Sequence, residues 1–285
     1  MKGTSAAPDA FRRLDAGRFG IGPEPIHLLT GRSARRTPVP EVICHVRSEP
    51  LPEGAFRRLG PELLVASPEL SFLEMASVLP LPKLAEYGCF LCGTYTVGPD
   101  TAANDREPLT TKRKLGRFVG QMGGAKGCKQ ARRALCSIAE AAASPYETKL
   151  MLLLAMPAKQ GGYGFPLPDL NKCIAFTQHE RRLYGRPFVV LDLYWRDRAL
   201  AIEYDGQAHH SSRKDLERDR RKTSELSCKG ITVLRVDRGQ LASPSSVYVL
   251  AKKLARLMGK QIHPPTPQQW CNRRSTYSQL MGRIP

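Results

Sequence analysis

The stretch "LDLYWRDRALAIEYDGQAHH", residues 191–210, sets acidic side chains among residues that are otherwise typical of buried β-strands. The acids are Asp192, Asp197, Glu203 and Asp205. On each side of Arg196-Asp197, apolar residues recur at every second position, which predicts two strands joined by a tight turn. Like charges held close together raise the free energy unless a cation or a basic partner compensates them. The stretch therefore predicts a hairpin with a cation beside its acids.

The tight turn also predicts which residues face each other across the hairpin. Leu193 pairs with Leu200, and one face then carries only apolar side chains. On the other face Asp192 lies diagonal to Glu203, with roughly 7–8 Å or less between their Cβ atoms, and Asp205 follows on the same side. Carboxylate oxygens in this arrangement suit Mg²⁺ or Mn²⁺. The alternative is a solvated face whose acids pair with nearby arginines, because antiparallel sheets often expose one face to water.

The hairpin belongs to a longer alternation of helices and strands. The strands of the hairpin are predicted for "RPFVVLDLYW" and "RALAIEYDG", and a further strand for "ITVLRV". Helices are predicted for "SPYETKLMLLLAM", for "DLERDRRKTSELSCKG", which Gly230 closes, and for "SSVYVLAKKLARLMG". This order indicates an α/β domain.

A basic segment precedes that domain. Between Pro108 and Ala139 the sequence has no acidic residue, and the spacing fits two short amphipathic helices split at "GGAKG". Its basic residues are Lys112, Arg113, Lys114, Arg117, Lys126, Lys129, Arg132 and Arg133. The exposed faces of the two helices therefore predict contact with nucleic acid. The alternative is a solvated helix surface without a partner.

Composition supports the same partner. The 285 residues include 44 Lys and Arg against 26 Asp and Glu, a net charge of +18 that attracts polyanions. The cysteines are scattered, which favours reduced thiols in a cytoplasmic protein. Cys89 and Cys92 form a C-x2-C pair, but no second pair of comparable spacing completes a zinc site. The longest strongly apolar run, "LMLLLAM", is too short to span a bilayer, so no membrane partner is expected.

Residues 144–236 resemble the PD-(D/E)xK nuclease superfamily, specifically its branch of uncharacterised domains similar to very-short-patch-repair endonucleases. The resemblance runs through "SPYETKL", "LPDLN", "LDLYWRDRALAIEYDG", "HH", "RDRRK" and "GITVLRV", in that order and at similar spacing. It implies a restriction-endonuclease-like αβββαβ core with a mixed sheet. It also implies a Mg²⁺- or Mn²⁺-dependent DNA endonuclease that hydrolyses phosphodiester bonds.

The region upstream is similar to a different family. "HVRSEPLPEG" and "LLVASPELSFLEMASVL" resemble the regulator-type segment of AbiEi-type antitoxin-like proteins, although the winged helix-turn-helix that usually precedes it is not evident. Two helices are predicted there, one in "ASPELSFLEMASVL" and one over 81–92. The expected organisation is an α+β regulator-like region at 1–107, the basic connector at 108–140, the endonuclease-like domain at 141–260 and an irregular tail at 261–285.

Position by position, the resemblance assigns the metal site. Asp192 and Glu203 match the metal-binding acids, Glu147 matches the helix glutamate that completes the site, and the carbonyl of Tyr204 is a further expected ligand. Asp205 stands where the superfamily has a lysine that normally positions or activates the attacking water. We expect Asp205 to act instead as a third carboxylate ligand, because it lies on the same strand face as Glu203.

The resemblance also extends to a histidine and to the next helix. His209 matches a recurring histidine that acts as a base or contacts phosphate. Asp219 and Arg220 match a further polar pair. The residues expected to contact nucleic acid are Lys112, Arg113, Lys114, Arg117, Arg220 and Arg221.

Each assignment has a simpler alternative. Glu147 can close a capping box with Ser144, which needs only local geometry. His209 can be a surface imidazole, and Asp219 can pair with Lys222 one helical turn later.

The function has alternatives as well. Asp205 in place of lysine favours a non-catalytic DNA-binding regulator or antitoxin-like protein that retains the nuclease fold. The joint presence of Glu147, Asp192 and Glu203 argues against that alternative. Charge alone does not separate DNA from RNA, so an RNA-binding or tRNA-processing protein is a third hypothesis.

Overall fold

A computed structural model of the chain describes residues 26–30, 42–47, 49–60, 64–97, 106–206 and 213–282. The chain divides into two compact units, Met1–Pro52 and Glu53–Pro285. The boundaries predicted at 107, 140 and 260 fall inside the second unit and stay predictions. None of the helices in the described ranges has the length and apolar character needed to cross a bilayer.

The first unit contains a pair of parallel strands. β1 (Ile26–Thr30) pairs with β2 (Val42–Val46), and Ile26 lies opposite Val42. The rings of His27 and His45 stack across the pair with their centroids 4.9 Å apart.

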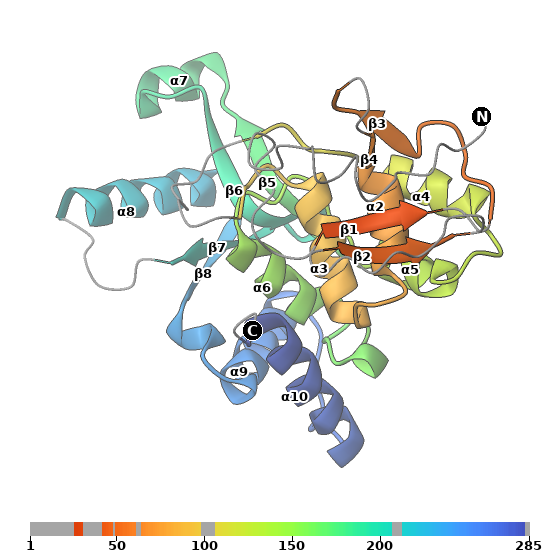
Figure 1. Ribbon diagram of the computed structural model, residues 1–285. Coiled ribbons are helices and arrows are strands. Elements are labelled where there is room, and N and C mark those ends of the chain that lie inside the picture. Colours follow the sequence, from red (N-terminus) through yellow and green to blue (C-terminus); the bar gives the residue numbers. More distant parts are fainter. Residues whose placement is uncertain are drawn as a thin grey trace. The chain divides into compact units, whose positions relative to one another are not determined.

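The second unit contains a four-stranded sheet, and its strands follow each other in chain order. They are β5 (Asp169–Ala175), β6 (Phe188–Trp195), β7 (Leu200–Asp205) and β8 (Thr232–Asp237). β5, β6 and β7 are antiparallel neighbours, whereas β8 runs parallel to β7. A parallel neighbour requires a crossover, and helix α8 (Arg213–Cys228) supplies it (Figure 1). The predicted α/β class with a mixed sheet is confirmed.

Helices flank the sheet in the predicted order. α6 (Pro145–Ala155) precedes β5 and α9 (Pro244–Leu257) follows β8. The short helix α7 (Gln178–Tyr184) lies between β5 and β6 and was not predicted. Two three-residue strands, β3 (Phe56–Arg58) and β4 (Leu64–Ala66), form a small antiparallel pair ahead of the helices.

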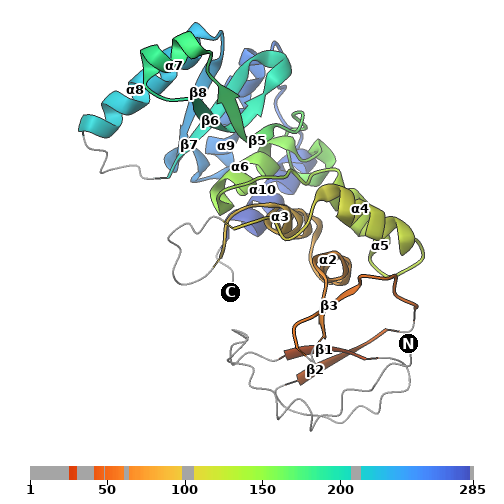
Figure 2. The same cartoon turned by 90° about the horizontal axis from the view of Figure 1, so that it is seen from above.

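The helical part of the second unit agrees with the sequence. Its helices are α2 (Pro68–Met75), α3 (Leu81–Cys92), α4 (Lys112–Gln121) and α5 (Cys128–Leu135). Ser67 caps α2 by accepting from the Leu70 N–H, and Thr111 caps α4 by accepting from the Lys114 N–H. In Figure 2 these helices occupy one end of the unit, and the sheet with α7 and α8 occupies the other.

The prediction of an irregular tail is wrong for most of its length. α10 (Pro267–Met281) begins with a capping box between Thr266 and Gln269, buries Leu280, and packs against α3, α6 and α9. Few apolar residues recur along this helix, so its hydrophobic periodicity was too weak to reveal it.

The hairpin differs from its predicted register by two residues. Leu193 pairs with Ile202 and Trp195 with Leu200, because the connection is a longer loop over 196–199 rather than a two-residue turn. Ala199 takes the left-handed conformation, φ +43°, which a sequence without Gly or Asn at that position does not signal. A shift of two residues leaves every side chain on its predicted face.

Both faces of the sheet are covered. Leu191 and Leu193 are buried on one face, and Tyr194 and Ala201 are buried on the other. Leu226 of α8 belongs to one buried cluster with Leu191, Tyr194 and Ala201, and Lys222 of the same helix reaches Glu203 on the face of Tyr194 and Ala201. The face that carries the predicted acids is therefore not the solvated face of an open sheet.

Candidate active site

The two central acids lie on adjacent strands beside this core. The observed register, extended by one residue from the Leu193–Ile202 pair, sets Asp192 directly opposite Glu203. Oδ2 of Asp192 accepts a hydrogen bond from the backbone N–H of Tyr204 at 2.7 Å. In this extended register Asp192 and Glu203 are cross-strand neighbours rather than the diagonal pair that was predicted.

Glu203 has one satisfied oxygen and one unsatisfied oxygen. Its Oε2 accepts a hydrogen bond from Nζ of Lys222, which reaches across from α8, and both side chains are largely buried. Its Oε1 is buried and accepts no hydrogen bond from the residues that the structure describes. A buried carboxylate oxygen without a donor is costly, so this atom is a natural ligand for a cation.

Burial and mutual repulsion change the acidity of the pair. Burial, together with the neighbouring charges of Glu203 and Glu147, raises the pKa of Asp192 from its ordinary 3.8 to about 7. Burial also raises the pKa of Glu203, although Lys222 acts in the opposite direction. A cation bound beside the pair would counteract the burial and repulsion that raise both pKa values.

Glu147 lies at the first turn of α6 and is nearly fully buried. Its Oε1 accepts from Oγ of Ser144 at 2.8 Å, and its Oε2 accepts from the N–H of Ala143 at 3.0 Å and from Nδ2 of Asn171 at 2.6 Å. The Glu147 carboxylate thus makes the local contacts of a helix cap and also bonds Asn171 of β5 in the sheet. The hydrogen bond between Asn171 and Glu147 matters because the register of β5 and β6 sets Asn171 across from Asp192.

The remaining expected site residues are at the end of β7 or beyond it. Asp205 pairs with Asp237 across the parallel strands β7 and β8. The ring of Tyr204 stacks on that of Tyr146, at the start of α6, with centroids 5.4 Å apart. His209 lies outside the described residues.

The described side chains supply fewer ligands than a complete metal site needs. Within the described ranges, no three His, Cys, Asp or Glu side chains form a group that could hold a metal ion. Asp192 and Glu203, with the carbonyl of Tyr204, are the candidate ligands, and the unsatisfied Oε1 of Glu203 is the atom that fits a cation best. The rest of an octahedral shell would be water, as is usual for Mg²⁺.

The C-x2-C pair lies within the helical part of the unit. Cys89 and Cys92 are buried on α3, and burial raises the pKa of each thiol to about 12.

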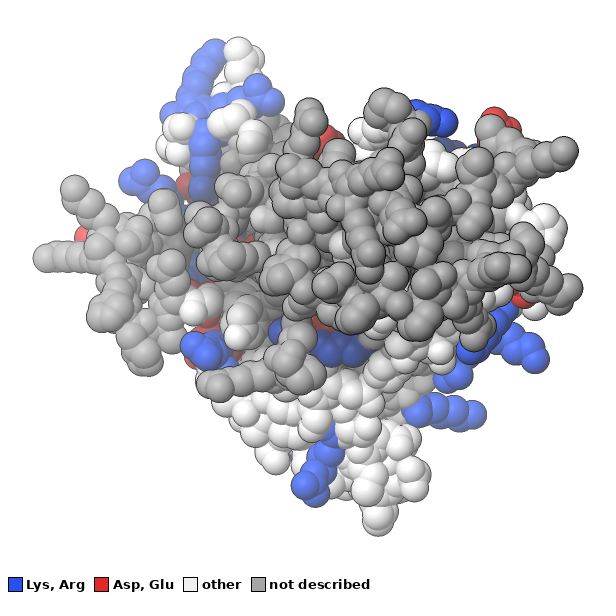
Figure 3. Space-filling view, viewed as in Figure 1, with Lys and Arg blue, Asp and Glu red and all other residues white. Residues whose placement is uncertain are grey.

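The predicted nucleic-acid contacts come from two separate helices. Arg113, Lys114 and Arg117 are exposed on α4, where Leu115 and Phe118 face inward. Arg220 and Arg221 are exposed on α8, the helix that also carries Lys222. Figure 3 shows further basic side chains gathered over α7, which contributes Arg181 and Arg182.

Two residues that contact the acids were absent from the predicted site. Lys222 was expected only to pair with Asp219 along its own helix, and Asn171 was not singled out. The sequence could have predicted that Lys222 faces the sheet. Lys222 precedes the core residue Leu226 by four positions and therefore shares its helix face.

Comparisons with protein-family models, with curated proteins and with solved structures find no match to this chain. Its function is therefore inferred from the geometry of the site.

Proposed function

We propose that the domain built from α6, the four-stranded sheet, α8 and α9 is a metal-dependent nuclease that hydrolyses phosphodiester bonds, with DNA as the leading substrate. The observation that carries this proposal is the buried pair of Asp192 and Glu203, which leaves one carboxylate oxygen without a donor. The raised pKa of Asp192 supports it, because a bound cation would favour the charged form that burial disfavours.

Asp192 and Glu203 would hold the metal, with the Tyr204 carbonyl beside them and Mg²⁺ or Mn²⁺ as the ion. When bound, the metal would lower the pKa of a coordinated water and stabilise charge on the phosphate. Glu147 would position the site by fixing Asn171 next to Asp192.

Lys222 would supply the positive group that Asp205 cannot. Its ammonium lies against Glu203, on the helix that also presents Arg220 and Arg221 to solvent. A phosphate held by those arginines would bring its charge close to Lys222, which would stabilise the negative charge that develops during hydrolysis.

The alternative is a DNA-binding protein that retains this architecture without turnover. The ion pair between Lys222 and Glu203 favours it, because the lysine neutralises part of the site without any metal. Asp205→Lys separates the two functions. A rise in cleavage from near zero would support the alternative, whereas a fall would support the metal-ligand role of Asp205.

The direct experiment incubates the purified chain with supercoiled plasmid, single-stranded DNA and RNA, each with Mg²⁺, Mn²⁺ or a chelator. We expect metal-dependent cleavage that both Asp192→Ala and Glu203→Ala abolish while circular dichroism shows intact folding. The double variant should be no worse than either single one, because both residues serve one ion. Cleavage that persists in both single variants would refute the proposal.

A further inference from the structure

The short helix α7 adds little to the core of the domain, yet both of its ends are fixed. None of its seven residues is buried. Thr177 and Glu180 form a capping box at its start, and Gly185 ends it in the left-handed conformation, φ +71°. An isolated helix of this length is unstable in water, so contacts with the rest of the domain hold α7 in place.

These contacts lie on the inner side of α7. The ring of Tyr184 meets the buried ring of Phe176 with centroids 5.0 Å apart, and Nε of Arg181 donates to the Phe176 carbonyl at 3.0 Å. Nζ of Lys229, just after α8, bonds the Glu180 carboxylate. Several independent contacts thus fix the inner side. Glu180→Gln leaves α7 in place, since glutamine also serves a capping box.

The outer side of α7 carries His179, Arg182 and Leu183, which lie at i, i+3 and i+4 on one helix face. All three side chains are exposed, and Leu183 is 67% exposed. Arg182 makes no hydrogen bond or ion pair within the part of the chain that the structure describes. Glu180 is the one acid in the sequence of this helix, and Lys229 pairs with it. The outer side therefore presents a positive charge that no described carboxylate neutralises.

The outer side of α7 continues the basic surface of α8. Arg186, which follows α7, bonds Glu225 of α8 through Nε at 3.0 Å. Arg221 precedes Glu225 by four residues, so both lie on the side of α8 that faces α7. Arg221 is also next to Lys222, whose ammonium bonds Glu203. Basic side chains gather over α7 in Figure 3, so a polyanion that reaches the acid pair along α8 also meets α7.

The chemistry of this outer side fits the phosphate backbone of a DNA duplex. A guanidinium suits phosphate because its planar fork donates two parallel hydrogen bonds. Unpaired strands are held largely by stacking of their bases on aromatic rings. The Tyr184 ring packs against Phe176, so α7 offers no Phe, Tyr or Trp ring for such stacking. A backbone contact without stacking favours a duplex over a single strand.

We propose that α7 is a second DNA-contacting element, in which Arg182 binds the phosphate backbone of a duplex beyond the phosphate held by Arg220 and Arg221. This inference rests on the proposed action on DNA, and it narrows the substrate to duplexes that extend past the cleaved bond toward α7. A phosphate contact of this kind adds affinity without base preference.

Fluorescence anisotropy in the presence of chelator, which prevents metal-dependent cleavage, tests the proposal on DNA duplexes of increasing length. Arg182→Gln should weaken binding of the longer duplexes by about 3–10-fold and lower the salt slope by roughly 0.9, as expected for one lost phosphate contact. The shortest duplexes that bind should show no difference from the wild type, because they do not reach α7. Thermal unfolding should be unchanged, since Arg182 has no partner among the described residues.

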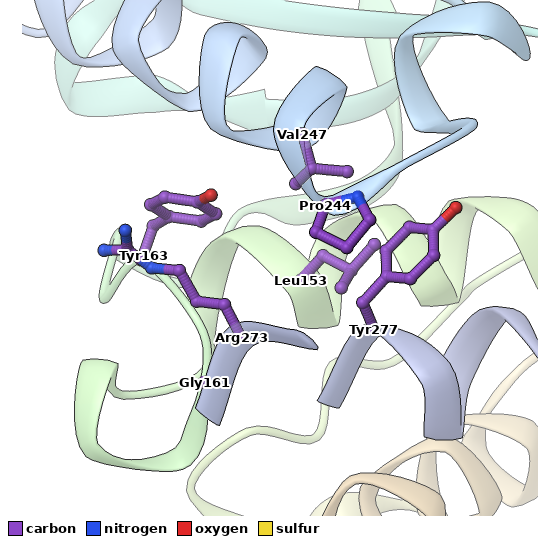
Figure 4. A pocket seen from close by; sticks show the side chains of 7 residues that line it. All are labelled: Leu153, Gly161, Tyr163, Pro244, Val247, Arg273 and Tyr277. Carbon is purple, nitrogen blue, oxygen red and sulfur yellow. The ribbon is translucent and has the colours of Figure 1, made fainter. Parts of the chain in front are cut away.

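Arg274→Gln on α10 is the matched control, because Arg274 is also exposed and its loss removes the same charge. Its neighbour Arg273 would not match, since that guanidinium is buried against the ring of Tyr163 (Figure 4). The control should bind every duplex as the wild type does.

Equal weakening in Arg182→Gln and Arg274→Gln would overturn the proposal, because the effect would then follow net charge alone. An unchanged affinity of Arg182→Gln for long duplexes would also overturn it, as would an equal loss on single strands of the same length or a wild type that binds no duplex. Cleavage is measured separately with Mn²⁺. A chain that binds duplexes through Arg182 but does not cut them would support the role of α7 and refute the nuclease.

Discussion

Two acid–lysine pairs connect α8 and the turn after it to the rest of the domain, and they hold their carboxylates in opposite electrostatic states. Lys229 bonds Glu180 at the start of α7, and this contact, with the N–H of Thr177, lowers the pKa of Glu180 to about 2. Lys222 bonds Glu203 in the middle of the sheet, yet burial keeps the pKa of Glu203 above its ordinary value.

The difference lies in the surroundings of the two carboxylates. Glu180 takes part in a capping box, where the N–H of Thr177 and Nζ of Lys229 reach its two oxygens. Glu203 faces Asp192 and keeps one oxygen without a donor. The same pair of residue types thus accompanies a lowered carboxyl pKa at a helix end and a raised one in the sheet, and a raised pKa of this kind is typical of functional sites.

The largest effect is expected on cleavage. Asp192→Asn and Glu203→Gln should each lower metal-dependent cleavage by about 10²–10³-fold or more, since each removes a charge that binds the metal. Glu180→Gln, the matched change in the other pair, should leave the rate unchanged. Rates measured on supercoiled plasmid check this, and a comparable loss in Glu180→Gln would show that the two pairs do not differ in function.

The next effect is on the pH dependence of stability without metal. The pKa of Asp192 is about 7 in the folded chain, so between pH 4 and 7 the folded state binds more protons than the unfolded state. Stability therefore falls as the pH rises through this window, by on the order of 2–4 kcal/mol. Asp192→Asn cannot titrate and should flatten this fall in urea melts with chelator. A wild type that gains stability from pH 4 to 7 relative to Asp192→Asn would contradict the raised pKa.

Replacing Lys222 or Lys229 compares how much each ion pair contributes to the free energy of unfolding. Lys222→Met should destabilise the metal-free protein at pH 8 by about 1–3 kcal/mol, because Glu203 loses the ammonium that bonds its Oε2. Lys229→Met should cost less, since Glu180 keeps the Thr177 N–H. Denaturant unfolding of the two variants measures this. Equal losses would mean that the sheet site holds no excess charge.

The smallest effect is expected on nucleic-acid affinity. Charge reversal at Lys112, Arg113 and Lys114 should weaken binding to unrelated DNA sequences alike, by about tenfold, and lower the salt slope by roughly 0.9 for each lost phosphate contact. Fluorescence anisotropy at several salt concentrations checks both. Sequence-selective loss with an unchanged slope would indicate base contacts instead.

Much of the fold was predictable because it depends on local signals. Strand alternation gave β6, β7 and β8, and the Ser67, Thr111 and Ser144 caps mark real helix starts. The faces of Asp192 and Glu203 were predictable even with the wrong loop, since a two-residue shift preserves them.

The missing parts depend on tertiary contacts. Lys222 meets Glu203 only because α8 crosses back over the sheet, a relation that spacing along one helix cannot reveal. Asn171 reaches Glu147 because it adopts the left-handed conformation, φ +46°, within β5. The helix α10 is held by packing rather than by periodicity.

Calorimetric titration of the chelator-treated chain with Mn²⁺ between pH 6 and 8 tests the central claim most directly. We predict one bound ion per chain, with affinity that rises through pH 7 as Asp192 loses its proton, and no binding at the same concentrations in Asp192→Asn or Glu203→Gln. The Glu180→Gln control should bind as the wild type does. Absence of binding in the wild type, or equal binding in the Asp192 and Glu203 variants, would contradict a cation site between β6 and β7.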